Sequence, residues 1–275
     1  MVPVALPELT GWNFEPWLLA LLASSAALYA LGAARLWSRA GTGRGVTHGH
    51  VLRFALGWLV LAIALVSPVD AWAERTFTAH MVQHELLMVV AAPLFVTARP
   101  LEAWTWALPP AWRRALGDAA RARALRRVWG YITEPVGAWT LHALALWAWH
   151  APRFFEAALE DESIHIAQHA CFLASALLFW WSVLARRTRH AEGVALASLF
   201  TTMMHTSVLG ALLTFAPGAW YGHYASAPIP GLSPLEDQQL GGLIMWVPAG
   251  MVYITAGLVI VAAWLRDGPR PARLR

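Results

Sequence analysis

Apolar residues form long runs along this chain, separated by short polar stretches. Seven of these runs approach the roughly 20 residues that a helix needs to cross the hydrocarbon core of a membrane. Backbone exposed to lipid must satisfy its own hydrogen bonds, so the runs predict helices rather than strands. The predicted spans cover residues 17–37, 51–69, 79–98, 134–150, 164–184, 194–216 and 240–264.

The composition agrees with a protein embedded in a lipid bilayer. Hydrophobic residues make up 58% of the chain and charged residues only 13%, whereas a soluble domain carries about a quarter of charged residues. The 17 tryptophans suit a protein that meets two lipid–water interfaces. Residues 1–16 contain no Lys or Arg, so the first run is expected to be retained rather than cleaved as a signal peptide. We predict an all-α, polytopic helical bundle of seven transmembrane helices, forming a single domain over residues 1–275.

The basic residues predict the orientation of this bundle. All 20 of them are arginines, and all but Arg75 and Arg153 lie in or beside the linkers 38–50, 99–133 and 185–193 or in the tail from 266. Cytoplasmic loops carry such an excess, so the N-terminus is expected outside and the C-terminus in the cytoplasm. The odd number of spans requires the same opposition.

The same placement argues against a nucleic-acid partner, which a basic protein can otherwise suggest. In the long arginine-rich loop, Pro109-Pro110 is expected to open an amphipathic helix over residues 111–129. Such a helix would rest on anionic headgroups at the cytoplasmic face.

Histidines are the candidate functional residues. His80 and His84, and also His165 and His169, have i,i+4 spacing, which stacks two imidazoles on one face of a helix. The topology puts both pairs in the outer half of their spans, and it puts His150 at the outer end of the fourth span. We expect these five residues to share one outward-facing site with His205 of the sixth span. His142 is expected to make a hydrogen bond in the packing between helices.

A metal ion is the first interpretation of this site, because ionisable groups inside a membrane are costly and usually functional. Neutral imidazole binds zinc, copper and iron, and methionine thioethers favour Cu(I). Possible soft ligands or supporting groups are Met81, Met88, Met204, Glu85, Asp237 and Gln238. The alternatives are a polar packing network, a proton relay, or haem held by one imidazole from each of two helices.

Several motifs of the chain also occur together in one family. They are His80-Met81-Val82-Gln83-His84 leading to Ala92-Pro93-Leu94, Trp149-His150 with Pro152, His165 with His169, Met204-His205, and the run from Asp237-Gln238 to Trp246. Over roughly residues 15–265 the chain resembles the CtaG-like, caa3-type cytochrome c oxidase assembly factors.

The resemblance implies a multi-pass protein of the bacterial plasma membrane that matures a haem–copper oxidase without enzymatic turnover of its own. Its partners would be an oxidase subunit in the membrane and a periplasmic or extracellular copper donor. We expect copper as the bound ion, with zinc or haem as alternatives. The competing functions are a haem-binding membrane oxidoreductase and a proton-coupled metal transporter.

Overall fold

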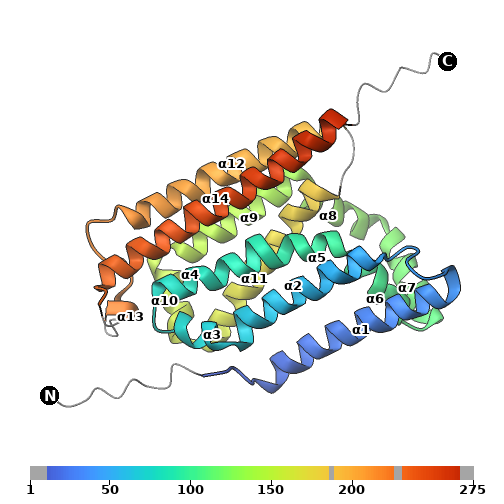
Figure 1. Cartoon of the computed structure of the whole chain (residues 1–275), viewed down its shortest axis with the longest axis horizontal. Helices are drawn as coiled ribbons and strands as arrows, with labels where there is room; N and C mark the ends of the chain where they lie inside the picture. Colours follow the sequence, from blue (N-terminus) through green and yellow to red (C-terminus); the bar gives the residue numbers. More distant parts are fainter. Residues whose placement is uncertain (1–10, 186–188, 226–230, 267–275) are drawn as a thin grey trace.

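The computed structural model describes residues 11–185, 189–225 and 231–266, and within these ranges every regular element is helical. Long helices run side by side, with α1 at one edge of the bundle and α12 and α14 at the opposite edge (Figure 1). The elements are α1 (Pro16–Ala40), α2 (His48–Val66), α3 (Pro68–Ala73), α4 (Phe77–Glu85), η1 (Leu86–Ala91), α5 (Ala92–Ala98), α6 (Pro100–Ala107), α7 (Pro110–Arg121), α8 (Arg123–Thr133), α9 (Pro135–His150), α10 (Pro152–Glu160), α11 (Glu162–Leu184), α12 (Arg189–Thr214), α13 (Gly222–Ala225) and α14 (Pro234–Arg266).

The all-helical prediction is confirmed for the described residues, and six helices there are long and apolar enough to cross a membrane. They are α1, α2, the continuous α4–η1–α5, α11, α12 and α14, and each coincides with one of the predicted spans. The remaining predicted span, 134–150, coincides with α9. The 16 residues of α9 extend about 24 Å at 1.5 Å per residue, less than the roughly 30 Å of a hydrocarbon core.

The short helices form two groups, one at each end of the bundle. Figure 1 shows α3, α10 and α13 at one end of the bundle and α6, α7 and α8 at the other. The first set belongs to the loops that are poor in arginine, and the second set to the longest arginine-rich linker. The two kinds of loop therefore lie on opposite ends of the molecule.

The helix expected over 111–129 is in fact two helices, α7 and α8, and the prediction of a single element is wrong. Ala122 between them is extended, with ψ of 131°. The break turns α8 toward the bundle, where Trp129 stacks edge-on against Trp181 of α11 with ring centres 6.0 Å apart. No residue of α7 is buried, in keeping with an element at the surface.

The third span contains a π-helical segment, η1, directly after Glu85. The amide of Ala92 donates to the carbonyl of Leu87, five residues earlier. In the α register the carbonyl of Met88 would accept from the amide of Ala92, which already donates to Leu87. In the π register it would accept from Pro93, which has no amide hydrogen. The indole of Trp180 donates to it instead at 2.9 Å, which fixes α11 against the third span.

Glycines bring α14 close to its neighbours. A Cβ atom on Gly242 would lie 2.7 Å from the carbonyl oxygen of Gly210 on α12, and one on Gly241 would lie 2.4 Å from the ring of Phe77. Small residues allow such close helix crossings in membrane bundles. As a result, the start of α14 reaches the start of α4, three residues before the first histidine pair.

Candidate metal centre

Five of the six predicted histidines gather near the end of the bundle that holds α3, α10 and α13. His80 and His84 come from α4, His165 and His169 from α11, and His150 from the last turn of α9. Ring centres lie 4.3 Å apart within each i,i+4 pair, 5.4 Å apart between His80 and His165, and 5.3 Å apart between His84 and His169. His150 joins through His84, at 6.2 Å. We call these five residues the histidine centre.

Three members of the histidine centre are arranged to share one ion. One ring nitrogen from each of His80, His165 and His169 lies within 4.8 Å of the other two. Nitrogens bonded to one metal at about 2.0 to 2.1 Å are themselves about 3.3 to 4 Å apart, so small side-chain rotations would close this group on an ion. We call these three residues the triad.

Hydrogen bonds orient His80 for such a role. The hydroxyl of Tyr224 donates to the carbonyl of Ala73 at 2.9 Å, and its oxygen lies 3.1 Å from Nδ1 of His80. Since that hydroxyl proton is already used, Nδ1–H of His80 is the donor. The Nε2 lone pair is then free, and it is buried without a hydrogen-bond partner. A ligand histidine is usually oriented in this way, through its second nitrogen.

Burial keeps the Tyr224 hydroxyl protonated. Tyr224 lies in α13, outside the membrane-spanning helices, and it is only 4% exposed. Burial, followed by the negative charge of Asp237, raises the pKa of this hydroxyl well above its usual value. Tyr224 therefore remains a donor to Ala73 and an acceptor for His80 at any physiological pH.

His150 is oriented by its own helix. Its Nδ1 lies 2.7 Å from the carbonyl oxygen of Leu146, which can only accept, so Nδ1 carries the proton and Nε2 is free. That Nε2 is buried without a partner, as are both ring nitrogens of His84. Phe172 covers the two residues, with its ring centre 4.6 Å from that of His84 and 5.8 Å from that of His150.

Asp237 holds the helix that carries the first pair. Its carboxylate accepts from the backbone amides of Phe77 at 2.7 Å and of Thr78 at 3.1 Å. These amides belong to the first turn of α4, where no carbonyl within the helix can accept from them. A negative charge is also stabilising at a helix N-terminus. Asp237 thus positions His80 through the backbone of α4.

Gln238 and Tyr221 fix the loop that follows α12. Oε1 of Gln238 accepts from the amide of Trp220 at 2.6 Å. The hydroxyl of Tyr221 donates to the carbonyl of His150 at 2.8 Å, at the point where Pro152 prevents α9 from continuing. Both side chains support the histidine centre from the end of the bundle that holds α13.

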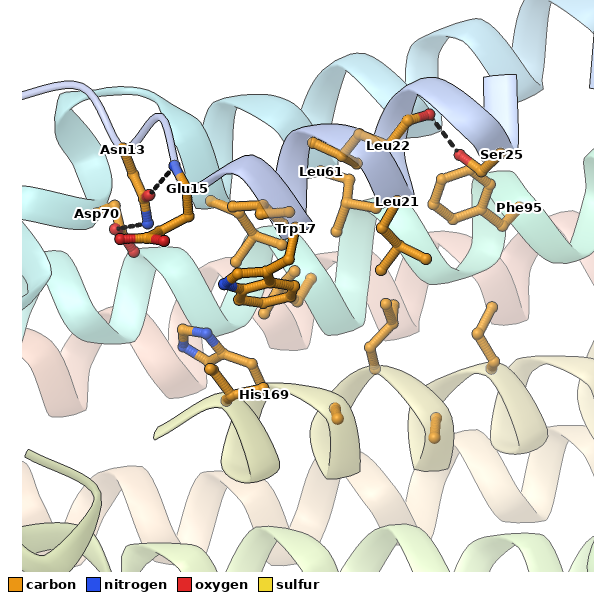
Figure 2. Close-up of a pocket in the computed structure, with 18 of the residues that line it drawn as sticks. Asn13, Glu15, Trp17, Leu21, Leu22, Ser25, Leu61, Asp70, Phe95 and His169 are labelled. Atoms are coloured by element: carbon orange, nitrogen blue, oxygen red, sulfur yellow. Dashed lines mark hydrogen bonds between the residues drawn. The ribbon is translucent and has the colours of Figure 1, made fainter. Parts of the chain in front are cut away.

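The histidine centre opens sideways into an apolar cleft of about 1090 Å³ between α1 and α11. The cleft exists because α1 packs mainly against α6. Trp17 of α1 and His169 of α11 point into it from opposite sides (Figure 2). His165, Asp70 and Glu74 also line this cleft.

His205 does not join the histidine centre, which corrects the expectation of a single site with six histidines. Its ring centre lies 5.6 Å from that of Trp139 on α9. Trp139 precedes His150 by 11 residues in that helix, or about 16 Å at 1.5 Å per residue. His205 therefore lies deeper in the bundle. His142 makes the hydrogen bond expected of it, 3.0 Å from Nδ1 to Oγ of Ser175.

The predicted soft ligands lie in other surroundings. Met81 packs with Phe77 against α14, Met88 belongs to the central apolar core, and Met204 is 48% exposed on α12. Glu85 turns a buried carboxylate oxygen, without a hydrogen-bond partner, into the bundle.

Sequence reasoning missed the groups that support the histidine centre from outside. One is Tyr224, and another is the chain of hydrogen bonds in which Gln83 donates to Asp70 at 2.6 Å and Asn13 donates to the same carboxylate at 2.9 Å. Gln83 stands between His80 and His84 in the sequence, and an amide side chain inside a predicted span already indicates a buried polar contact. Nothing in the sequence connects Tyr224 with His80.

The buried ring nitrogens of this arrangement could coordinate an ion. Buried polar atoms in proteins are nearly always hydrogen-bonded, and each exception calls for an explanation such as an ion or a water. Imidazole lone pairs that meet in an apolar interior fit a zinc, copper or iron ion. Three histidines leave one coordination position open, as in metal sites that exchange a ligand.

This chain is similar to one described protein family. The sequence model of the cytochrome c oxidase caa3 assembly factors (Caa3_CtaG) matches residues 27–267. Uncharacterized proteins of Mycobacterium bovis and Mycobacterium tuberculosis are each 26% identical over 284 residues, covering 98% of this chain and 42% of the relative. A third, from Mycobacterium leprae, is 24% identical over 235 residues, covering 79% of this chain and 35% of the relative.

This chain therefore spans less than half the length of those relatives. No solved structure matches it. The family match covers most of the chain, including every histidine of the centre. The chain belongs to the family of cytochrome c oxidase caa3 assembly factors.

Proposed function

We propose that this chain receives copper at the outer side of the plasma membrane and passes it to a haem–copper oxidase during assembly. The observation that carries the proposal is the triad, in which His80, His165 and His169 bring nitrogens within 4.8 Å of one another. The Nε2 atoms of all three are buried and lack hydrogen-bond partners. The family supplies the client, because its members assemble a cytochrome c oxidase.

Copper is the ion that best accounts for both the triad of histidines and the oxidase client. The catalytic copper of a haem–copper oxidase is bound by histidines inside the membrane. A donor site with the same ligand type at a similar depth would exchange the ion with little change in its solvation. The open position left by three histidines gives a ligand of the client a place to bind before the donor ligands leave.

The proposed topology puts this exchange on the outer side. In it, α9 is the fourth of seven spans, the N-terminus is outside, and the arginine-rich end with α6, α7 and α8 faces the cytoplasm. The acidic end then carries the histidine centre toward a periplasmic or extracellular copper donor. The cleft beside His165 and His169 gives a client within the bilayer a lateral approach.

A proton-coupled metal transporter is less well supported. A carrier needs polar groups that continue to the other face, but apolar side chains close the histidine centre from below. Phe172, Leu146 and Phe179 are each at most 2% exposed and belong to one apolar core.

The test removes two triad members together, as His80→Ala with His169→Ala. Protein purified without chelators should lose the copper ion that the triad binds, counted per chain by elemental analysis, because one remaining imidazole cannot hold that ion. Cells that depend on this variant should lose assembled oxidase activity. The matched control is His142→Ala with His205→Ala, which removes two histidines from the same helical bundle and should keep both copper and oxidase.

Full copper occupancy in the triad variant would overturn the proposal. A visible spectrum of the same preparations provides a second decision. A Soret band that disappears with His80 and His169 would instead make the protein a haem-binding oxidoreductase.

A further inference from the structure

We infer that the histidine centre holds two metal ions: an outer ion on the triad, and an inner ion between His84 and His150 that selects monovalent copper. This inference rests on the proposed function, because it assumes that the centre binds metal. It adds a second site, with its own ligands, geometry and selectivity.

Five imidazoles in this arrangement cannot serve a single ion. The group whose nitrogens lie within 4.8 Å of one another comprises His80, His165 and His169, and neither His84 nor His150 belongs to it. Around one ion, ligand nitrogens lie no more than about 4 Å apart. His84 and His150 are therefore left with three buried nitrogens that have no hydrogen-bond partner.

The separation of these two rings fits an ion between them. Their centres are 6.2 Å apart. With metal–nitrogen bonds of about 2.0 to 2.1 Å, two imidazoles on opposite sides of one ion have ring centres roughly 6 Å apart. The proton on Nδ1 of His150 leaves Nε2 as the single nitrogen that can face the ion.

Because the inner site has two ligands, the number of ligands decides which ion it binds. Zinc prefers four ligands in a tetrahedron, and among the described residues His84 and His150 belong to no group of three histidine, cysteine or carboxylate ligands. Phe172 contacts both rings, and the ring centre of Phe155 lies 6.2 Å from that of His150. Monovalent copper accepts two nitrogen ligands in a line, so the inner site discriminates by ligand number.

The outer and inner sites also differ in access. His165 and His169 line the lateral cleft, whereas His84 and His150 are each 1% exposed and do not line it. His84 nevertheless lies beside the triad, with its ring centre 4.3 Å from that of His80 and 5.3 Å from that of His169. An ion can thus move between the sites by exchange of neighbouring imidazoles, with the inner site as the reserve and the outer site as the point of transfer.

The experiment counts ions per chain under reducing, anaerobic conditions. Purified full-length protein is titrated with Cu(I) against a coloured Cu(I) chelator, and separately with Zn(II). The wild type should bind two Cu(I) but one Zn(II). His150→Ala should bind one Cu(I) and keep its Zn(II), whereas His165→Ala should keep one Cu(I) and weaken Zn(II) at least about tenfold.

His150→Gln provides a second form of the inner-site variant. Its side-chain amide can still donate to the Leu146 carbonyl, but it offers no imidazole nitrogen, so a loss of one Cu(I) without unfolding would support the inner site. His142→Ala is the matched control and should bind both ions.

A wild type that saturates at one Cu(I), with no change in His150→Ala or His150→Gln, would overturn the two-site inference and leave the proposed copper function standing. A wild type that binds neither Cu(I) nor Zn(II) would overturn both.

Discussion

The histidine centre and the deeper histidines His142 and His205 use the same side chain in different settings. In the centre, five imidazoles from α4, α9 and α11 turn unpartnered nitrogens toward one another. Deeper in the bundle, His142 is hydrogen-bonded to Ser175 and stacked on Phe179, with ring centres 5.3 Å apart. His205 lies against Trp139.

The difference lies in how many imidazoles each helix brings to the same level. An i,i+4 pair gives two ligands from one helix, so two helices with such pairs supply four without any loop. His142 and His205 are single residues on α9 and α12. Nε2 of His142 and both ring nitrogens of His205 are also buried without a hydrogen-bond partner, but the described residues offer no group of three ligands there. In the proposed function, the metal ligands therefore differ from the other histidines by their neighbours and not by their depth.

Support from outside the cluster separates the two regions further. The histidine centre depends on polar groups of α14, of α13 and of the loop before α13, namely Asp237, Tyr224 and Tyr221. His142 depends on one hydroxyl from the adjacent helix. Changes to these supporting groups should therefore affect metal binding in the first region and stability alone in the second.

The largest effect is expected from Asp237→Asn. An amide oxygen can replace only one of the two carboxylate oxygens that accept from Phe77 and Thr78, and the negative charge at the start of α4 is lost. Copper affinity should fall about 10- to 100-fold, as it does when groups behind metal ligands are changed. The midpoint of thermal unfolding in detergent should also fall, by an amount that reflects about 1 to 3 kcal/mol. Unchanged copper affinity would show that α4 needs no such anchor.

A smaller effect on the same site is expected from Tyr224→Phe. The ring is kept, but His80 loses the hydroxyl that accepts from its Nδ1–H. The carbonyl of Ala73, 3.4 Å from that nitrogen, can replace it in part. Copper affinity should fall about 10-fold, at the lower end of the range for such changes, with the number of bound ions unchanged. Tyr29→Phe is the matched control, because its buried hydroxyl also bonds a backbone carbonyl, that of Ala98, and no imidazole.

Much of the histidine centre could be predicted from the sequence because its geometry is local. The spacing of His80 with His84 and of His165 with His169 determines their alignment on a helix. The placement of the arginines also predicted that both pairs and His150 lie at the same end of the bundle. His205 was wrongly grouped with them because topology gives only a coarse depth, although its mid-span position already set it apart.

The remaining features depend on contacts between distant segments. Asp237 meets Phe77 across 160 positions of the chain, and only the packing of α14 on α4 brings them together. The π-helical segment after Glu85 needs both Pro93, which is visible in the sequence, and Trp180, whose indole accommodates the freed carbonyl. The break between α7 and α8 falls at Ala122, a residue that normally favours helix.

Ser175→Ala should produce the smallest change in metal binding. It tests the comparison at the deeper histidines instead of at the histidine centre. It leaves Nδ1–H of His142 buried without an acceptor, which costs about 1 to 3 kcal/mol of stability. The thermal midpoint in detergent should fall, while copper stoichiometry and affinity remain those of the wild type. If copper binding fell as it does in Tyr224→Phe, His142 would have to act with the histidine centre, and the separation of the two regions would not hold. If Ser175→Ala and Tyr224→Phe lost the same amount of stability and only Tyr224→Phe lost copper affinity, loss of stability alone could not explain the loss of copper binding.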